Sequence, residues 1–269
     1  MKNRMDKPEQ FSFGYFPVYM ARLAIMLLIL AGNCLVNAQS NRKVPKHHFE
    51  TGEELIYSMH YGWFTIGKAT ILMDQELWNI QGKPHYYLQC RIQTTGVFDF
   101  FSSVDVCAES WIDVATLRPT ISYRQFFIGQ SMDIRTDRFE YADSVTISTY
   151  VEDVNRHQVA KVNISDTLVL DLLSTYLNLR DIVYSNDGSD TTMVKMHFSN
   201  DIYPFGIVHS GMEDEYYRFD LIFPETEEYE KGSPAYLLAK KEDTIIPVKL
   251  VVELTLGKLV FILNKRNYY

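Results

Sequence analysis

Residues 88–94, LQCRIQT, and residues 104–109, VDVCAE, decide the expected fold class. In both stretches apolar and polar side chains alternate one by one, which is typical of a β-strand with one buried face. The segment between them, residues 96–101, is loop-like and rich in aromatic side chains. We therefore expect two neighbouring antiparallel strands that bury the same face of a sheet.

The alternation also predicts the register of this pair. Directly opposed residues of an antiparallel pair share a face, so Ile92 should lie opposite Val106. This register places Cys90 opposite Ala108, whereas aligning Cys90 with Cys107 would place apolar side chains opposite acidic ones. A β-bulge is the one local change that would bring the two cysteines together. We predict two unbridged thiols.

The same alternation recurs along most of the chain. Turn-rich clusters such as residues 81–84 (QGKP) and 185–188 (SNDG) separate the alternating runs. Short strands with brief connections predict a mainly β protein, an antiparallel meander that forms a half-open barrel or a sandwich, as a single domain over residues 52–269. The expected strands cover residues 55–61, 64–73, 86–94, 104–112, 121–128, 132–141, 145–151, 158–164, 193–198, 216–223, 245–254 and 259–263.

One segment departs from the period of two. Residues 165–180, SDTLVLDLLSTYLNLR, repeat leucine at helical spacing, with Ser165 as N-cap and Arg180 at the C-terminal end. We expect one amphipathic helix around residues 167–180. Beside a large sheet such a helix usually covers an open end of the apolar layer, and a direct role in ligand binding is the alternative.

The N-terminal region indicates export. Residues 23–30, LAIMLLIL, follow Arg22 and precede a small-residue exit at residues 36–38, as in a secretory signal peptide. The apolar run is shorter than the roughly 20 residues that a transmembrane helix needs. We expect a signal peptide over residues 1–38, with Met20 as an alternative start, then a polar arm over residues 39–51. The mature chain should contain no transmembrane helix and should reside in the periplasm or outer envelope of a Gram-negative bacterium.

The charge balance disfavours nucleic acid as a partner. The chain has a formal net charge of −8, and removal of residues 1–38 takes away four cations and two anions, which makes it −10. Nucleic-acid binding needs clustered Lys and Arg to neutralise phosphates. An acidic exported protein should remain in solution and avoid anionic surfaces.

The sequence contains no recognisable catalytic or cofactor motif. It lacks a GxSxG elbow, a glycine-rich phosphate loop, HExxH, CxxC and an EF-hand loop. Its seven His residues are scattered, and the acidic clusters at residues 213–215 and 225–230 are typical of solvated loop edges. We therefore expect no metal site, no cofactor and no catalytic residue, and we favour a protein that is not an enzyme.

Aromatic residues are the most concrete functional signal. They make up 14% of the chain, more than the packing of one core requires. Most should pack inside the sheet, but some are candidates to line a concave apolar surface, with residues 96–101 at its mouth. The candidate ligand-binding residues are Trp63, Phe64, Phe98, Phe100, Phe101, Phe126, Tyr203 and Phe205, together with the neighbouring candidates Phe127 and Tyr236.

Four segments resemble the exported bacterial family known as domain of unknown function 3108. They are GEELIYSMHYGWFTIGKATI (residues 52–71), TTGVFDFF with DVCAESWIDVATLRP (residues 94–119), DLLSTYLNLR (residues 171–180) and EDTIIPVKLVVELTLGKLVFIL (residues 242–263). The resemblance implies an envelope-exported, mostly antiparallel β protein of uncharacterised activity, and it brings no catalytic residues. It implies an architectural role in turns, strand ends and a helix anchor for Gly52, Glu53, Tyr57, Gly67, Gly96, Asp171, Ser174, Arg180 and Pro247.

Several functions are compatible with these observations. The preferred one is a periplasmic binding or carrier protein for a lipid-like or glycan ligand. The alternatives are a scaffolding or assembly factor of the outer envelope that binds other envelope proteins, an integral outer-membrane β-barrel, and an envelope hydrolase. The polar run at residues 264–267 argues against the integral barrel, and the missing catalytic motif ranks the hydrolase last.

Overall fold

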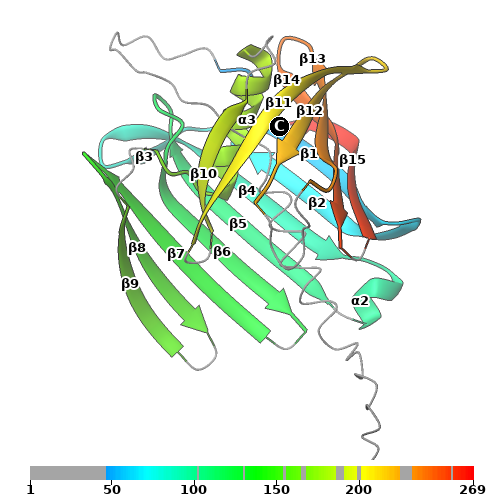
Figure 1. The fold of residues 1–269 in the computed structure, drawn as a ribbon. Helices are drawn as coiled ribbons and strands as arrows, with labels where there is room; N and C mark the ends of the chain where they lie inside the picture. Colours follow the sequence, from blue (N-terminus) through cyan, green and yellow to red (C-terminus); the bar gives the residue numbers. More distant parts are fainter. Residues whose placement is uncertain are drawn as a thin grey trace, which may run out of the picture.

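The computed structural model describes residues 47–101, 103–129, 131–153, 156–164, 168–185, 191–198, 201–224, 232–255 and 257–269. Within these ranges fifteen strands form one antiparallel sheet accompanied by two helices, of which one is short. The expected class is confirmed: the chain is a mainly β antiparallel meander that curves without closing (Figure 1).

The strands follow the chain order except at one place. The first nine are β1 (Glu53–Tyr61), β2 (Phe64–Met73), β3 (Trp78–Ile80), β4 (Lys83–Thr94), β5 (Val104–Asp113), β6 (Pro119–Ile128), β7 (Ser131–Tyr141), β8 (Val145–Asp153) and β9 (Arg156–Ile164). The last six are β10 (Thr192–Phe198), β11 (Asp201–Glu213), β12 (Tyr216–Ile222), β13 (Ala235–Lys241), β14 (Ile245–Leu254) and β15 (Gly257–Tyr268). Because β15 pairs with β1, the two halves join in the middle of the sheet, and β9 and β10 are its ends.

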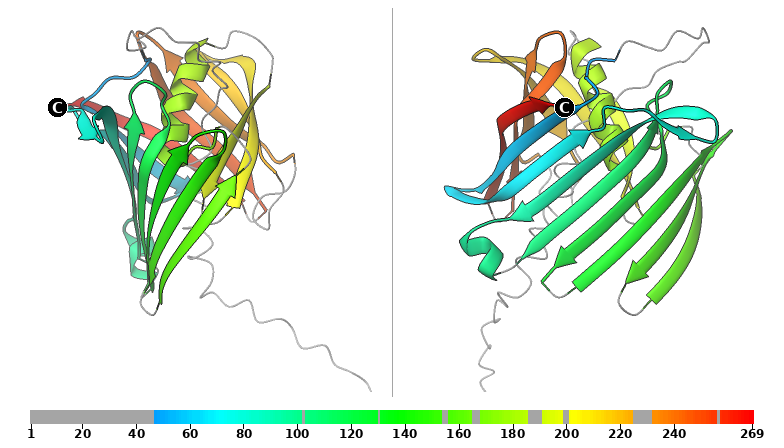
Figure 2. Two further views of the ribbon diagram at one scale, coloured as in Figure 1. Left: turned by 90° about the vertical axis from the view of Figure 1, so that its left-hand side faces the viewer. Right: turned by 180° about the vertical axis from the view of Figure 1, so that it is seen from behind.

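Helix α3 (Leu172–Ser185) connects the two halves and lies between them. Figure 2 shows it between the wall that contains β4 to β9 and the wall that contains β10 to β14. The side chains of Leu173 and Leu177 are at most 2% exposed, and burial of each contributes about 1.5–3 kcal/mol. The helix therefore fills one end of the curved sheet, as its leucine spacing predicts.

The helix begins later than expected. It starts at Leu172 rather than near residue 167, because Leu170 is in an extended segment whose backbone bonds β10: Leu170 N–H donates to Lys195 at 3.0 Å, and His197 N–H donates to Leu170 at 2.8 Å. Asp171 is the cap, since its carboxylate accepts the Ser174 backbone N–H at 2.8 Å. The expected cap, Ser165, lies outside the described residues.

Several elements differ from the sequence-based expectation. Each of the twelve expected strands overlaps an observed one, but β3, β11 and β13 were not expected. A second helix, the short α2 (Val97–Phe101), forms where a loop was expected. Pro204 and Gly206 interrupt the β-forming pattern of β11, which is why its sequence did not indicate a strand.

The predicted register of the central pair is confirmed. Ile92 of β4 faces Val106 of β5, so Cys90 faces Ala108. Cys90 is buried on the inner face, whereas Cys107 lies at a half-buried position of the opposite face. The two thiols are free and are separated by the sheet itself.

The inner face of the sheet is not uniform. The main apolar core is built from β1, β2, β4, β5, β10 to β15 and α3. The inner face of β6, β7 and β8 instead carries the buried polar side chains Ser122, Arg124, Arg135, Asp137 and Thr149. The interior therefore has an apolar part and a charged part.

Candidate functional site

A group of charged side chains is buried where β10 approaches the inner face of β6, β7 and β8. Arg124 donates from Nη2 to Oδ2 of Asp137 at 2.5 Å, and the Thr149 hydroxyl donates to Oδ1 of the same carboxylate at 2.6 Å. Nδ1 of His197 lies 3.6 Å from that Oδ2. All four residues are at most 2% exposed. Together with Arg135 they form what we call the interior charged cluster.

The carboxylate of this cluster remains ionised at any physiological pH. Burial alone would raise the pKa of Asp137, but the nearby His197 and the charge of Arg124 lower it to about 2. Both oxygens of Asp137 already accept hydrogen bonds, one from Arg124 and one from Thr149. Each oxygen of Asp137 is therefore engaged by a neighbour on β6 or β8.

The cluster also contains two arginines side by side. Arg124 of β6 directly faces Arg135 of β7 across the sheet. Like charges opposite one another on neighbouring strands destabilise a sheet. Burial and the charge of Arg124 lower the pKa of Arg135, while Asp137 and Asp133 act in the opposite direction. The pair holds two cationic groups close together in the interior.

Some polar atoms of the cluster make no hydrogen bond. Within the part of the chain that the structure describes, Nε of Arg124 and both ring nitrogens of His197 make no hydrogen bond, although Nδ1 of His197 lies within ion-pair distance of Asp137. An unsatisfied buried polar group costs about 1–3 kcal/mol. A polar ligand that reaches these atoms would remove that cost.

Aromatic rings border the cluster. The guanidinium carbon of Arg124 lies 4.9 Å from the ring centroid of Phe198, and Phe126 packs edge-on against Phe198 at 6.4 Å. Phe139 contacts the His197 ring at 6.0 Å. The charged groups are thus enclosed by apolar surfaces, which strengthens electrostatic interactions by lowering the local dielectric constant.

A second candidate surface lies at the opposite ends of the strands from α3, around the β1–β2 turn and α2. Trp63 in the turn between β1 and β2 contacts Phe64 at 5.3 Å, and Phe64 contacts Phe98 of α2 at 5.9 Å. Trp63 is 88% exposed and Phe100 of α2 is 87% exposed. We call Trp63, Phe64, Phe98 and Phe100 the aromatic end. Figure 1 shows α2 and α3 at opposite ends of the sheet.

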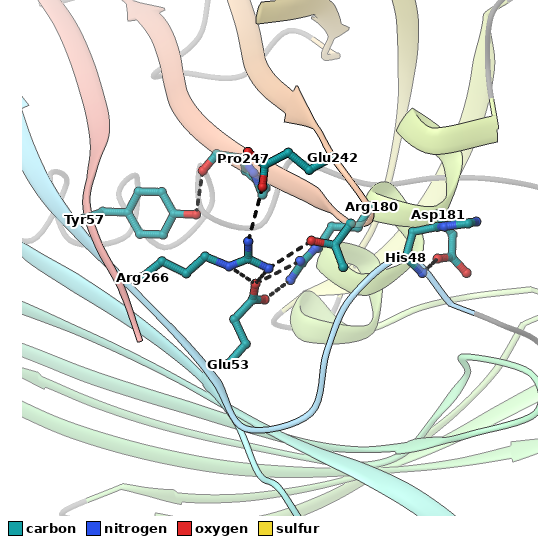
Figure 3. Close-up of polar contacts among 9 residues, drawn as sticks. His48, Glu53, Tyr57, Arg180, Asp181, Glu242, Pro247 and Arg266 are labelled. Carbon is teal, nitrogen blue, oxygen red and sulfur yellow. Dashed lines mark hydrogen bonds and ion pairs between the residues drawn. The ribbon is translucent and has the colours of Figure 1, made fainter. Parts of the chain in front are cut away.

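An ion-pair network fastens α3 to the sheet (Figure 3). Arg180 of α3 forms an ion pair with Glu53 of β1, and Nε of Arg266 donates to the same carboxylate at 2.8 Å. Glu53 and Arg180 are at most 3% exposed. Nη2 of Arg266 also donates to the Thr244 hydroxyl at 2.9 Å. One carboxylate therefore connects β1, α3 and β15.

The residues ahead of β1 reinforce this attachment. Nδ1 of His47 lies 2.7 Å from Oδ2 of Asp181, and Nε2 lies 3.0 Å from the carbonyl oxygen of Val114. Both partners are acceptors, so the arrangement favours the doubly protonated ring, in which both nitrogens donate. Burial alone would lower the pKa of His47, but the hydrogen bonds to Asp181 and Val114 raise it. The backbone N–H of His48 donates to Asp181 as well, at 2.9 Å (Figure 3).

Comparison with known proteins settles the family. The model of the family described as protein of unknown function DUF3108 matches residues 56–264. The chain belongs to this family. A solved structure that resembles this DUF3108 member is the β-barrel-like protein of domain of unknown function DUF1849 from Brucella abortus, at 11% identity and a TM-score of 0.55. The match covers 82% of this chain and 98% of that one, and it concerns the fold alone. No curated protein matches the chain.

The recurring residues of the DUF3108 resemblance lie mainly around α3. Besides the pair of Glu53 and Arg180, the Tyr57 hydroxyl donates to the carbonyl oxygen of Pro247 at 2.9 Å (Figure 3). Asp171 and Ser174 form the helix cap described above, and burial raises the pKa of Asp171. These contacts hold elements together, in agreement with the helix-anchor role that the resemblance implies.

The structure places the predicted ligand-binding residues of this DUF3108 member in different parts of the fold. Trp63, Phe64, Phe98 and Phe100 form the aromatic end, whereas Phe126 borders the interior charged cluster. Tyr203 and Phe205 lie on β11; Tyr203 packs against the apolar core, and Phe205 is 1% exposed within it. The side chain of Phe101 lies outside the described residues. Phe127 is 40% exposed on the outer face, and Tyr236 packs against Arg218 at 3.9 Å.

Sequence reasoning missed the interior charged cluster altogether. In β6 the apolar side chains Ile121, Tyr123 and Phe127 share one face, but the buried face is the one with Ser122 and Arg124. The available signal was a repeated charge at alternate positions, Arg135 and Asp137, in the next strand.

The described residues show neither a metal-binding group nor a membrane-spanning helix. In the ranges that the structure covers, no three His, Cys, Asp or Glu side chains are grouped so that they could hold a metal ion. Neither of the two helices in those ranges is long and apolar enough to cross a membrane.

Proposed function

We propose that this DUF3108 protein is an exported cell-envelope protein that binds a lipid-like amphiphile and does not transform it. The observation that carries the proposal is the two-part interior of the unclosed sheet. One part is the apolar core between the walls, and the other is the interior charged cluster, with its unpaired donors on Arg124 and His197. A molecule with a chain and a polar head matches both parts.

The shape of the sheet supports the same function. The sheet ends at β9 on one side and β10 on the other, and the charged side chains of β7 and the His197 side chain of β10 lie near these ends. Ligand sites of β-proteins commonly occupy the mouth of a barrel and combine apolar walls with a few polar groups. Export to the periplasm or outer envelope is supported by the signal-peptide pattern of residues 1–38.

The direct test is to look for a co-purifying ligand. The full chain is purified from its native envelope without detergent, and organic extracts are analysed by mass spectrometry against an envelope protein of similar size. We expect a lipid at roughly one molecule per chain. Repeated absence of any lipid, with the protein folded by circular dichroism, would overturn the proposal.

The aromatic end favours a second candidate, an assembly factor that binds another envelope protein. Exposed tryptophan and phenylalanine side chains that contact one another are typical of protein-binding hot spots. Crosslinking in intact cells followed by co-purification tests this function. A specific partner that is lost in Trp63→Ala with Phe100→Ala, and retained in Trp78→Ala, would support it; an identical set of crosslinks in all variants would reject it.

A further inference from the structure

We propose that the interior charged cluster binds the anionic head group of the ligand, a carboxylate or a phosphate. This inference rests on the proposed function, and it names the ligand class. A neutral head group, such as an alcohol, would bind more weakly at the same place.

The unpaired atoms of the cluster are mainly donors. Nε of Arg124 can only donate, and a His197 ring carries at least one N–H, or two when it is protonated. The two residues are 2% exposed, so solvent does not satisfy these atoms freely. Carboxylate and phosphate oxygens are acceptors, and their hydrogen bonds to charged donors are about twice as strong as neutral ones.

The acidic side chains near the cluster do not accept hydrogen bonds from Nε of Arg124 or from the ring nitrogens of His197. Both oxygens of Asp137 are engaged, one by Arg124 and one by Thr149. Asp133 lies two positions before Arg135 on the same face of β7; the residue is half buried, and its Oδ1 is a buried acceptor without a hydrogen bond. Asp137 accepts from Nη2 of Arg124, so an anion at Nε would be a second acceptor for the same guanidinium.

The aromatic rings around the cluster form an apolar surface that the hydrocarbon chain of the ligand would contact. Phe126 and Phe198 lie beside Arg124, and Phe139 covers the other side of His197. A hydrocarbon chain attached to the head group would leave the cluster through these rings toward the main core. The low dielectric there strengthens the contact of the anion with Arg124.

The inference is tested with three probes that share one chain length. Dodecanoate, dodecyl phosphate and dodecanol are titrated separately into the full chain after lipid removal, below their critical micelle concentrations, by isothermal titration calorimetry. We expect at least one anionic probe to bind tenfold or more tighter than dodecanol. The tighter anion identifies the source, a fatty acid or a phosphate ester.

The outcomes separate this inference from the proposed function. Equal affinity for all three probes overturns the anionic site and leaves a lipid-binding protein. No binding of any probe overturns both. Preference for dodecanol overturns the anionic site as well.

Variants connect the preference to the cluster. His197→Phe removes the unpaired ring nitrogens and leaves the contacts among Arg124, Asp137 and Thr149 in place, so the variant should fold. We expect its preference for the anionic probe to fall to within twofold. Lys195→Gln, on the exposed face of the same strand, is the charge control and should retain the full preference. An unchanged preference in folded His197→Phe overturns the assignment.

Discussion

At the scale of single residues, the fold contains two buried ionic groups: the network of Glu53, Arg180 and Arg266, and the interior charged cluster. The pair of Glu53 and Arg180 is a structural fastening with matched charges, supported by Arg266. The interior charged cluster joins Asp137 to Arg124 and Thr149 and leaves Nε of Arg124 and the ring nitrogens of His197 without a hydrogen bond; Nε of Arg180 in the other group lacks one as well. Buried ion pairs contribute little net stability when complete, but removal of one partner leaves an uncompensated charge.

The first prediction concerns the ion-pair network of Glu53, Arg180 and Arg266. Glu53→Gln leaves the guanidinium groups of Arg180 and Arg266 without their carboxylate, so the free energy of unfolding should fall by about 3–5 kcal/mol. The measurement is urea denaturation followed by circular dichroism. Glu54→Gln, the neighbouring residue whose side chain bonds Asn267, is the matched control and should lose about 1 kcal/mol or less. Equal losses in the two variants would contradict the role of Glu53.

The second prediction concerns pH. The folded pKa of His47 is raised above its unfolded value of about 6.5, so its contribution to stability is fully present below that value and is lost as pH rises through the folded pKa. We expect the stability difference between the native chain and His47→Gln to be largest near pH 5.5 and to shrink by about pH 8.5. Urea denaturation at a series of pH values measures it. A difference that grows with pH would have the wrong sign.

At the scale of elements, the central strands were predictable because one face is consistently apolar. The run from Leu88 to Thr94 alternates without exception, so both strand and register follow from it. In β6 the rule fails, since burial of Arg124 and Ser122 is imposed by contacts with β7, β8 and β10 that a local pattern cannot reveal. The start of α3 was predicted too early for a related reason: Leu168 stands four residues before Leu172, which is helical spacing, but the backbone of Leu170 between them bonds β10.

The third prediction follows from the register of β4 and β5. Cys90 and Cys107 lie on opposite faces, and burial raises the pKa of the Cys90 thiol to about 12 and that of Cys107 to about 11. We expect an alkylating reagent to label the native chain slowly at Cys107 and to reach Cys90 only after unfolding. Intact mass after alkylation, with and without reductant, measures both. An unfolded chain that takes up two fewer alkyl groups before reduction than after it would show a disulfide and contradict the register.

At the scale of the whole molecule, the part of the sheet beside α3 and the aromatic end are built differently. The end with α3 is filled by side chains and ionic contacts, whereas the aromatic end exposes its rings. The sequence indicated that aromatic residues exceed the needs of packing, but it could not tell Trp63, which is exposed, from Phe205, which is buried. Whether each ring is buried depends on how the strands β4 to β9 and β10 to β14 lie relative to one another, which the local sequence does not specify.

The fourth prediction contrasts these ends. Trp63→Ala and Phe100→Ala should each change the free energy of unfolding by less than about 0.5 kcal/mol, because their side chains are mostly in solvent. Leu177→Ala in α3, at 1% exposure, should cost about 2–5 kcal/mol. Thermal and urea denaturation measure all three. A large loss in the aromatic variants would show that the aromatic end supports the fold.

The pairing of β1 with β15 constrains the order in which the chain can fold. Arg266 and Glu53 are 213 positions apart, yet they meet in the middle of the sheet and beside α3. Closing so long a loop costs entropy before any contact repays it, which makes such topologies slow to fold. Until the C-terminal strand has joined the sheet, β1 and β14 present unpaired edges that can pair with other chains. A chain with this connection needs protection from such pairing until its last strand is in place.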